Sequence, residues 1–242
     1  MRLHNRIAFI TGGGRGIGRA VALGFAREGA HIVVAARTLS ELQSVAEAVR
    51  ATGRRALAAP CDVTDEEQVK AALTTVLDEF GRIDILVNNA GIGAMRPIRA
   101  QSLGDWNRVL AVNLTGTFLC TKHVWKAMQA RGGGAIINIS SLAGRRGYEL
   151  LSAYSASKWG QIGFTLSAAE EGKPHGIRVN AVAPGKGDTA IRATLVEDKS
   201  KMLQADDHVG VCVFLASDEA RYITGQVIEI DYFDSSPPAQ GH

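Results

Sequence analysis

The sequence predicts an α/β fold in which a mostly parallel sheet of seven strands is doubly wound, with helices on both faces. Short apolar runs of strand length alternate with longer stretches of helical periodicity from the beginning of the chain to residue 230. Strands buried on both faces by helices are apolar throughout, as several of these runs are. The expected strands span residues 7–11, 31–36, 55–60, 84–87, 135–139, 177–182 and 226–230.

The composition is typical of a globular protein. The chain has 242 residues, of which 46% are hydrophobic and 21% charged, and no Pro/Ser-rich linker divides it. We therefore expect a single dinucleotide-binding and catalytic domain over residues 1–234. Residues 235–242 include two prolines and are expected to form a flexible C-terminal tail.

Charge and cysteine usage argue against several classes of protein. The formal net charge is only +3 and the basic residues are scattered, which argues against nucleic-acid binding. Cys61, Cys120 and Cys212 form no Cys-x-x-Cys pair and the histidines do not cluster, so we expect no metal site. The N-terminus lacks a signal-peptide pattern and no apolar stretch approaches the ~20 residues of a bilayer span. We expect a cytoplasmic protein without a membrane partner.

A glycine-rich turn follows the first expected strand. Residues 11–18 read Thr-Gly-Gly-Gly-Arg-Gly-Ile-Gly, and helical periodicity begins at once. In such a strand–turn–helix unit, the helix N-terminus offers free N–H groups to a pyrophosphate. Gly12, Gly16 and Gly18 are spaced G-x-x-x-G-x-G, whereas the usual dinucleotide fingerprint is G-x-G-x-x-G. A flexible turn without a ligand is the alternative.

The end of the second expected strand bears on the choice of cofactor. It finishes at Ala36 and Arg37, where an NAD site normally has an acidic residue for the adenosine ribose 2′-hydroxyl. An arginine suits a 2′-phosphate instead, and Arg15 in the glycine turn could be a second contact. These residues favour NADP(H) over NAD(H), although both arginines could also be solvated surface charges.

The expected helices alternate with the strands and carry further polar groups. Thr64, with Glu67 three residues on, is the expected N-cap of the third helix. Asn113 lies in the middle of the fourth helix, where an amide is costly unless it finds a polar partner or an ordered water. The expected helices after the glycine turn span residues 39–50, 65–80, 103–130, 151–171 and 206–216.

Tyr154 and Lys158 are four residues apart, so they lie one turn apart on the same face of a helix. A phenol normally has a pKa of about 10. An ammonium at about 4 Å, with an effective dielectric constant near 20, would favour the phenolate by about 4 kcal/mol before desolvation is subtracted. Such a shift is large enough for acid–base catalysis near neutral pH. Ser141 lies thirteen residues before Tyr154, at the carboxyl end of an expected strand.

Together these segments resemble the short-chain dehydrogenase/reductase family, over residues 5 to 231. The resemblance implies a Rossmann-type fold. It also implies that Asn113, Ser141, Tyr154 and Lys158 are the four catalytic residues. The cofactor-binding positions that it implies, with the two arginines above, are Gly12, Arg15, Gly16, Ile17, Gly18, Arg37, Asp62, Val63, Asn89, Ala90, Gly91, Tyr154, Lys158, Pro184, Gly185 and Thr189.

The family resemblance also implies the roles of these residues. Tyr154 would protonate the carbonyl oxygen as hydride leaves the nicotinamide, and Ser141 would donate a hydrogen bond to that oxygen. Lys158 would lower the pKa of Tyr154 and bind the nicotinamide ribose, and Asn113 would hold a water linking Lys158 to solvent. Ser140 is the alternative for the serine role, but strand alternation places it on the opposite face from Ser141.

The expected function is hydride transfer between NADP(H) and a small-molecule carbonyl or secondary alcohol. A 3-oxoacyl thioester is the first expectation, because Arg96, Arg145 and Arg146 could face an acidic carrier. A polyol, sugar or hydroxysteroid substrate is the alternative, and a non-catalytic NADP(H)-binding scaffold is a third. Only 24 residues lie between Thr189 and Phe214, which is short for a substrate lid in this family.

Aromatic residues are frequent on the two long helices around Asn113 and Tyr154. One face of a sheet covers such a surface only in part, so we expect a homo-oligomer, a dimer or tetramer, formed through these helices. Burial of the aromatics in the core is the alternative. The residues concerned are Trp106, Phe118, Trp125, Trp159 and Phe164.

Overall fold

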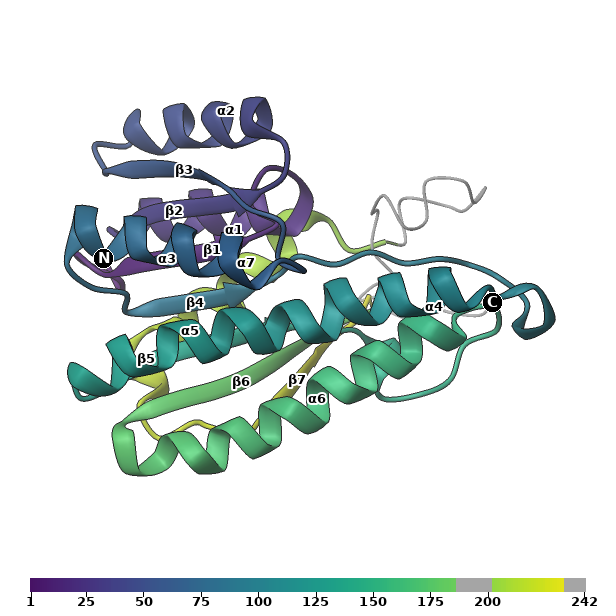
Figure 1. Cartoon of the computed structure of the whole chain (residues 1–242). Coiled ribbons are helices and arrows are strands. Elements are labelled where there is room, and N and C mark those ends of the chain that lie inside the picture. Colours follow the sequence, from purple (N-terminus) through teal and green to yellow (C-terminus); the bar gives the residue numbers. More distant parts are fainter. Residues whose placement is uncertain (186–201, 233–242) are drawn as a thin grey trace, which may run out of the picture.

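A computed structural model describes residues 1–185 and 202–232 of the chain. Seven strands form one sheet in the order β3-β2-β1-β4-β5-β6-β7 (Figure 1). All six strand pairings are parallel, so the sheet is wholly rather than mostly parallel. Each expected strand is confirmed to within two residues at both ends. The strands are β1 Ile7–Thr11, β2 His31–Ala36, β3 Ala56–Pro60, β4 Ile85–Asn88, β5 Gly134–Ile139, β6 Ile177–Pro184 and β7 Val227–Ile230.

Helices cover both faces of the sheet (Figure 1). Successive residues of a strand point to opposite faces, so Ile10 packs with α1, α2 and α7, whereas Phe9 packs with α3, α5 and α6. This burial on both faces explains why the strands are apolar throughout. The helices are α1 Gly16–Arg27, α2 Leu39–Arg50, α3 Glu66–Phe80, α4 Leu103–Leu110, α5 Gly116–Ala130, α6 Ser152–Gly172 and α7 Val209–Ala216. None of those described combines the length and the apolarity that a membrane span requires.

The start of α3 differs from the prediction. Asp65, not Thr64, is the N-cap, and its carboxylate accepts a hydrogen bond of 3.1 Å from the Gln68 N–H. The hydroxyl of Thr64 instead donates to Asp62 Oδ1 at 2.8 Å, and the Thr64 N–H donates to the same atom at 3.0 Å. Asp62 therefore closes a local turn with Thr64, which leaves the cap to the next residue.

The helix expected over residues 103–130 is one helical segment with a widened turn in its middle. The π turn Ala111–Thr115 joins α4 to α5 and carries Asn113. Such single π turns are rare and occur frequently at functional sites. The π turn therefore makes Asn113 a candidate functional residue.

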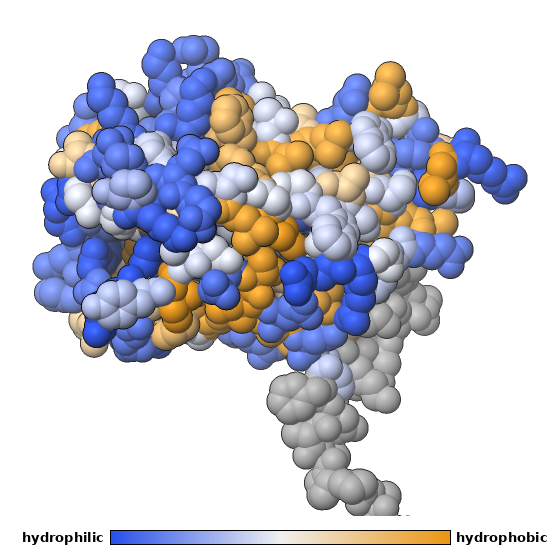
Figure 2. Space-filling view, turned by 90° about the horizontal axis from the view of Figure 1, so that it is seen from below, coloured by the Kyte–Doolittle hydropathy of each residue, from blue (hydrophilic) through white to orange (hydrophobic). Residues whose placement is uncertain are grey.

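The outer surface of α5 and α6 is rich in apolar side chains. Phe118 of α5 is exposed, as are Trp159 and Leu166 of α6. Figure 2 views the molecule from below, the side on which α6 and β7 lie, and shows apolar residues gathered in the middle of that side with hydrophilic residues around them. The rings of Phe118 and Phe164 meet edge to face at 6.2 Å, which joins the two helices on this surface.

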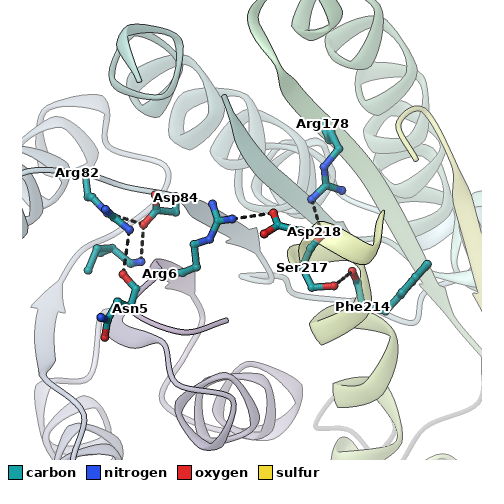
Figure 3. A network of polar contacts seen from close by, with 9 residues as sticks. Asn5, Arg6, Arg82, Asp84, Arg178, Phe214, Ser217 and Asp218 are labelled. Carbon is teal, nitrogen blue, oxygen red and sulfur yellow. Dashed lines mark hydrogen bonds and ion pairs between the residues drawn. The ribbon is translucent and has the colours of Figure 1, made fainter. Parts of the chain in front are cut away.

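A polar network closes the amino-terminal edge of the sheet (Figure 3). Asp84, just before β4, is buried, and its Oδ2 accepts hydrogen bonds from the Ile7 N–H at 2.7 Å and from Arg82 Nε at 2.9 Å. Arg6 Nη2 donates to Asp218 at 2.7 Å, just beyond the C-terminal end of α7. These contacts tie the start of the sheet to the last helix and leave its other edge open for a site.

Candidate active site

A cleft of about 640 Å³ lies at the carboxyl edge of the sheet. This volume is within the usual range for a small-molecule site, and open α/β sheets bind their ligands at this edge. Of the predicted site residues, the cleft is lined by Gly12, Arg15, Gly16, Ile17, Arg37, Asp62, Val63, Asn89, Ala90, Gly91, Ser141, Tyr154, Lys158, Pro184 and Gly185. Gly18 and Asn113 lie outside this lining, and Thr189 lies outside the described residues.

The glycine turn has a backbone that only glycine accommodates at several positions. Gly12 and Gly16 adopt φ angles of +62° and +55°, which glycine tolerates and other residues rarely adopt. A Cβ on Gly18 would lie 2.3 Å from the Gly12 carbonyl oxygen, so only glycine fits against the turn there. The N-terminus of α1 opens into the cleft through Gly16, so its free N–H groups suit the phosphates of a dinucleotide.

Asn89 fixes this turn from the end of β4. Its amide Nδ2 donates to the carbonyl oxygens of Thr11 and Gly12, at 2.9 and 3.1 Å. The hydroxyl of Thr11 accepts from the N–H groups of both Asn89 and Ala90, each at 3.0 Å. Asn89 thus holds the glycine turn through its side chain, and Thr11 is its partner.

The two arginines expected near an adenosine 2′-phosphate both line the cleft. Arg37 is exposed, and no ion-pair partner is found for it in the described part of the chain. Arg15 is also exposed and lies 3.9 Å from Glu41 Oε1, a carboxylate of α2 that also lines the cleft. Glu41 sits in the helix opened by Thr38, so its presence here could not be anticipated from the motif.

Tyr154 and Lys158 face the same cleft from α6. Lys158 is only 3% exposed, and its Nζ donates to the Ile139 carbonyl oxygen at 2.7 Å and to Gln161 Oε1 at 3.2 Å. The same nitrogen lies 5.7 Å from the centre of the Tyr154 ring. Burial lowers the pKa of Lys158 to about 7, because removal from water disfavours the ammonium.

Ser140 and Ser141 both line the cleft, just after the end of β5, so strand alternation does not separate them as expected, but their hydroxyls have different partners. Ser140 is buried, and its hydroxyl donates to the Lys158 carbonyl oxygen at 3.2 Å. Ser141 is half-buried; its Oγ accepts from the Ala143 N–H at 3.1 Å, and its proton faces the Pro184 carbonyl oxygen at the long distance of 3.4 Å. The hydroxyl of Ser141 is therefore the one that can turn its proton toward a ligand.

Asn113 is fully buried and finds the polar partners that its burial requires. Its amide Nδ2 donates to the Ile92 carbonyl oxygen and to Ser157 Oγ, both at 2.9 Å, and its Oδ1 accepts from the Ile92 N–H at 2.8 Å. Its backbone oxygen accepts from the Thr117 hydroxyl at 2.8 Å. The water that this residue is expected to hold stays a prediction.

The three arginines considered for an acidic carrier all lie beside acids. Arg145 pairs with Glu229 at 2.9 Å and Arg146 with Asp231 at 3.3 Å. Arg96 lies 3.9 Å from Asp105. The charges of these arginines are therefore balanced by nearby carboxylates, those of Arg145 and Arg146 by residues more than 80 positions away in the sequence, which weakens the argument for an acidic carrier.

Two buried polar residues near the cleft were not predicted. Gln161 touches Lys158, as described above. His208 lines the cleft and is buried; its Nδ1 faces the Gln204 carbonyl oxygen at 3.0 Å, while its Nε2 meets no hydrogen-bond partner within residues 1–185 and 202–232. Burial lowers the pKa of His208. Both residues read as helix interior in the sequence, where no motif distinguishes them.

Comparison with known proteins agrees with this geometry. Residues 6–200 match the family model described as short chain dehydrogenase. A cis-4-hydroxycyclohexanecarboxylate dehydrogenase from Sinomonas cyclohexanicum is 40% identical over 237 residues, which cover 93% of this chain and 95% of that protein. A 3-oxoacyl-[acyl-carrier-protein] reductase from Synechocystis sp. is 40% identical over 235 residues, with the same coverage of 93% and 95%.

The fold comparison points the same way. The crystal structure of a carveol dehydrogenase from Mycobacterium avium in complex with NAD superposes with a TM-score of 0.90 at 32% identity, covering 95% of this chain and 97% of that one. The chain therefore belongs to the short-chain dehydrogenase family, whose members are oxidoreductases that act on alcohol or carbonyl substrates with a nicotinamide cofactor.

Proposed function

We propose that the protein interconverts a ketone and a secondary alcohol with NADP(H) as its cofactor. The observation that carries the proposal is the burial of the Lys158 amine beside the Tyr154 ring, in the cleft that also holds the glycine turn. A buried amine next to a phenol is costly for stability and useful for proton transfer. The left-handed glycines and the blocked Cβ position at Gly18 fit a dinucleotide at the other part of the cleft.

Each of the four predicted catalytic residues has a role in this reaction. The bound nicotinamide supplies the hydride for the carbonyl carbon in the reducing direction. Tyr154 gives its phenolic proton to the carbonyl oxygen, and the hydroxyl of Ser141 donates a hydrogen bond to that oxygen. The ammonium of Lys158 favours the phenolate that Tyr154 becomes, and its remaining N–H is available for the nicotinamide ribose. Asn113 holds the π turn against Ile92 and Ser157 and, in this proposal, a water that returns the proton.

NADP(H) is proposed over NAD(H) because of the charges at the end of β2. Arg37 takes the place of the carboxylate that would bind a ribose 2′-hydroxyl, and its exposed guanidinium suits a 2′-phosphate. Glu41 is the opposing charge in the same part of the cleft, and its contact with Arg15 has to loosen if Arg15 is to take the phosphate.

For the substrate, we place ketones and secondary alcohols with an apolar ring or chain first. Ile92, Leu151 and Leu203 give the cleft apolar walls beyond the cofactor turn. A 3-oxoacyl thioester is the second candidate, supported by the relative of that activity. The ion pairs of Arg145 and Arg146 leave less positive charge for an acidic carrier than the sequence suggested.

A substrate panel tests the proposal. The purified protein is mixed with NADPH or NADH and with 4-oxocyclohexanecarboxylate, acetoacetyl-coenzyme A, fructose or a 3-ketosteroid, and the absorbance of the reduced nicotinamide is followed. We expect oxidation of NADPH with at least one ketone, faster than oxidation of NADH. Tight NADPH binding without turnover on any of them would instead support the non-catalytic scaffold.

We also propose a dimer or tetramer that buries the outer face of α5 and α6. Phe118 and Trp159 are 43% and 52% exposed, while Trp106, Trp125 and Phe164 are half-buried, so none of the five aromatics belongs fully to the core. A clustered apolar face of this kind typically marks a protein interface.

Light scattering at micromolar concentration tests the assembly. Trp159→Glu should shift the mass toward that of a monomer, because a carboxylate would be buried in the interface. Tyr222→Glu is the matched control, since Tyr222 is an 88% exposed aromatic elsewhere on the surface. A monomeric unsubstituted protein would contradict the proposal.

A further inference from the structure

A line of buried side chains leads from Lys158 into the space between α5 and α6. Gln161 is fully buried, and its Oε1 accepts a hydrogen bond from Lys158 Nζ at 3.2 Å. Its Nε2 donates to Thr117 Oγ1 at 2.8 Å, and the Thr117 hydroxyl donates to the Asn113 carbonyl oxygen at 2.8 Å. Lys158 on α6 is thereby connected through two side chains to the π turn that carries Asn113.

The direction of each hydrogen bond in this line is fixed by its neighbours. The one proton of the Thr117 hydroxyl is committed to the Asn113 carbonyl oxygen, so Thr117 can only accept from Gln161. Gln161 must therefore turn its NH₂ group toward Thr117 and its carbonyl oxygen toward Lys158. An ammonium has no acceptor, so the opposite orientation of the amide would place two donors face to face.

Gln161 Oε1 is important because of the other groups that surround the Lys158 amine. In the described part of the chain, Nζ contacts the Ile139 carbonyl oxygen, Gln161 Oε1 and the Tyr154 ring, and Tyr154 is the titratable group among these three. Within the described residues no carboxylate contributes to the pKa of Lys158, which burial alone shifts. Two neutral oxygens thus accept hydrogen bonds from the ammonium, and Gln161 supplies the one that belongs to a side chain.

We infer that Gln161 is a positioning residue, whose amide, anchored by Thr117, holds the Lys158 amine in its charged form beside Tyr154. The inference rests on the proposed function for its consequence, but the contact itself does not. An apolar residue would fill the same helix position without the cost of burying an amide, so the amide is expected to serve the ammonium.

The charge state of Lys158 tests this directly and without any substrate. The protein is labelled at lysine Cε and Nζ, and the resonance of Lys158, assigned by its loss in Lys158→Met, is titrated by NMR. Gln161→Leu should lower the titration midpoint by about one to two pH units, because one charge-assisted hydrogen bond is lost. Gln161→Glu should raise the midpoint instead, since it places an opposite charge beside the amine.

Two further variants separate positioning from a general loss of packing. Thr117→Val removes the anchor of the amide and should lower the midpoint by less than Gln161→Leu. Thr121→Val is the matched control: it removes one buried hydrogen bond, the 3.1 Å contact with Asn88, from the same helix without touching Gln161. It should leave the midpoint unchanged. An unchanged midpoint in Gln161→Leu would overturn the inference, and Gln161→Glu decides the matter if the leucine variant does not fold.

Turnover gives the second readout, with a ketone found active in the substrate panel. Gln161→Leu should lower kcat at pH 7 about fivefold if the midpoint falls by one unit and about fiftyfold if it falls by two, and Gln161→Glu should restore part of it. The KM for the ketone should change little, because Gln161 lies behind Lys158. A shifted midpoint in a protein without turnover would uphold the contact and refute the proposed function alone.

Discussion

The amino-terminal and carboxyl-terminal ends of the strands each hold a buried ionisable side chain, but its partners differ between the two. At the amino-terminal edge, the buried carboxylate of Asp84 accepts hydrogen bonds from Arg82 and from the Ile7 N–H (Figure 3). At the carboxyl edge, the buried amine of Lys158 has neutral partners, and burial lowers its pKa to about 7. The first arrangement compensates the charge and stabilises the fold; the second leaves the charge easy to remove.

One end of the sheet therefore serves mainly stability and the other mainly chemistry. A compensated charge contributes to folding, and its loss leaves an unpaired partner. A charge that is held at a cost can change its protonation state near neutral pH, which an acid–base catalyst requires. Variants at the amino edge should therefore alter stability with the chemistry intact. Variants at the carboxyl edge should alter the chemistry, and those of Lys158 should also alter how stability depends on pH.

The largest expected effect is that of Tyr154→Phe. Loss of the phenolic proton should lower kcat by about 10³-fold or more, near the upper part of the range for general acid catalysis. The Kd for NADPH, measured by nicotinamide fluorescence, should change less than about threefold, and the melting temperature should hold. A large loss of NADPH affinity would mean that Tyr154 has a structural role.

Asp84→Ala should give the next largest effect, on folding alone. The substitution leaves Arg82 and the Ile7 N–H without their hydrogen-bond acceptor. The free energy of unfolding should therefore fall by about 3 kcal/mol in urea titrations. Turnover per folded molecule should be unchanged. Asp78→Ala, at an exposed position of α3, is the control and should cost less than about 0.5 kcal/mol. A loss of kcat in folded Asp84→Ala would contradict the view that the amino-terminal edge serves stability and not the chemistry.

Lys158→Met should alter the pH dependence of stability. Lys158 has a folded pKa of about 7, below its ordinary value of 10.5. Between these values the unfolded chain binds more protons, so its contribution to the free energy of unfolding rises with pH and is lowest below pH 7. That rise, about 2.7 kcal/mol between pH 6 and 9, should be missing in Lys158→Met. If the free energy of unfolding depends on pH in the same way in both proteins, burial does not lower the pKa of Lys158.

Arg37→Asp should have the smallest effect of the four. The exchange of a guanidinium for a carboxylate should move the ratio of kcat/KM values for NADPH and NADH by about tenfold toward NADH. Arg19→Asp makes the same change of charge at an exposed position of α1 and should leave the ratio nearly unaltered. If both substitutions shift the ratio equally, Arg37 acts only through the net charge.

Much of this architecture could be predicted from sequence, because it follows from local pattern. Apolar runs marked all seven strands, and the four-residue spacing of Tyr154 and Lys158 placed them on one face of α6. The glycine turn was recognisable because its backbone demands residues without a Cβ at Gly12 and Gly18. These features depend on neighbours within a few residues.

What escaped prediction depends on partners far away in the sequence. The π turn at Asn113 forms around hydrogen bonds with Ile92 and Ser157, 21 and 44 residues away. The orientation of the Gln161 amide depends on its hydrogen bond with Thr117, 44 residues away. Arg146 pairs with Asp231, 85 residues further along the chain. A helical pattern shows that such residues face inward or outward, but not what they meet there.

The central claim, that this carboxyl-edge cleft transfers hydride between a nicotinamide and a carbonyl carbon, is tested most directly by isotope transfer. NADPH carrying deuterium on one or the other face of nicotinamide C4 is incubated with the protein and a ketone from the panel, and the alcohol product is weighed by mass spectrometry. The account predicts that one of the two labelled cofactors, and not the other, yields product with one deuterium at the carbinol carbon. Product without deuterium from both would contradict it.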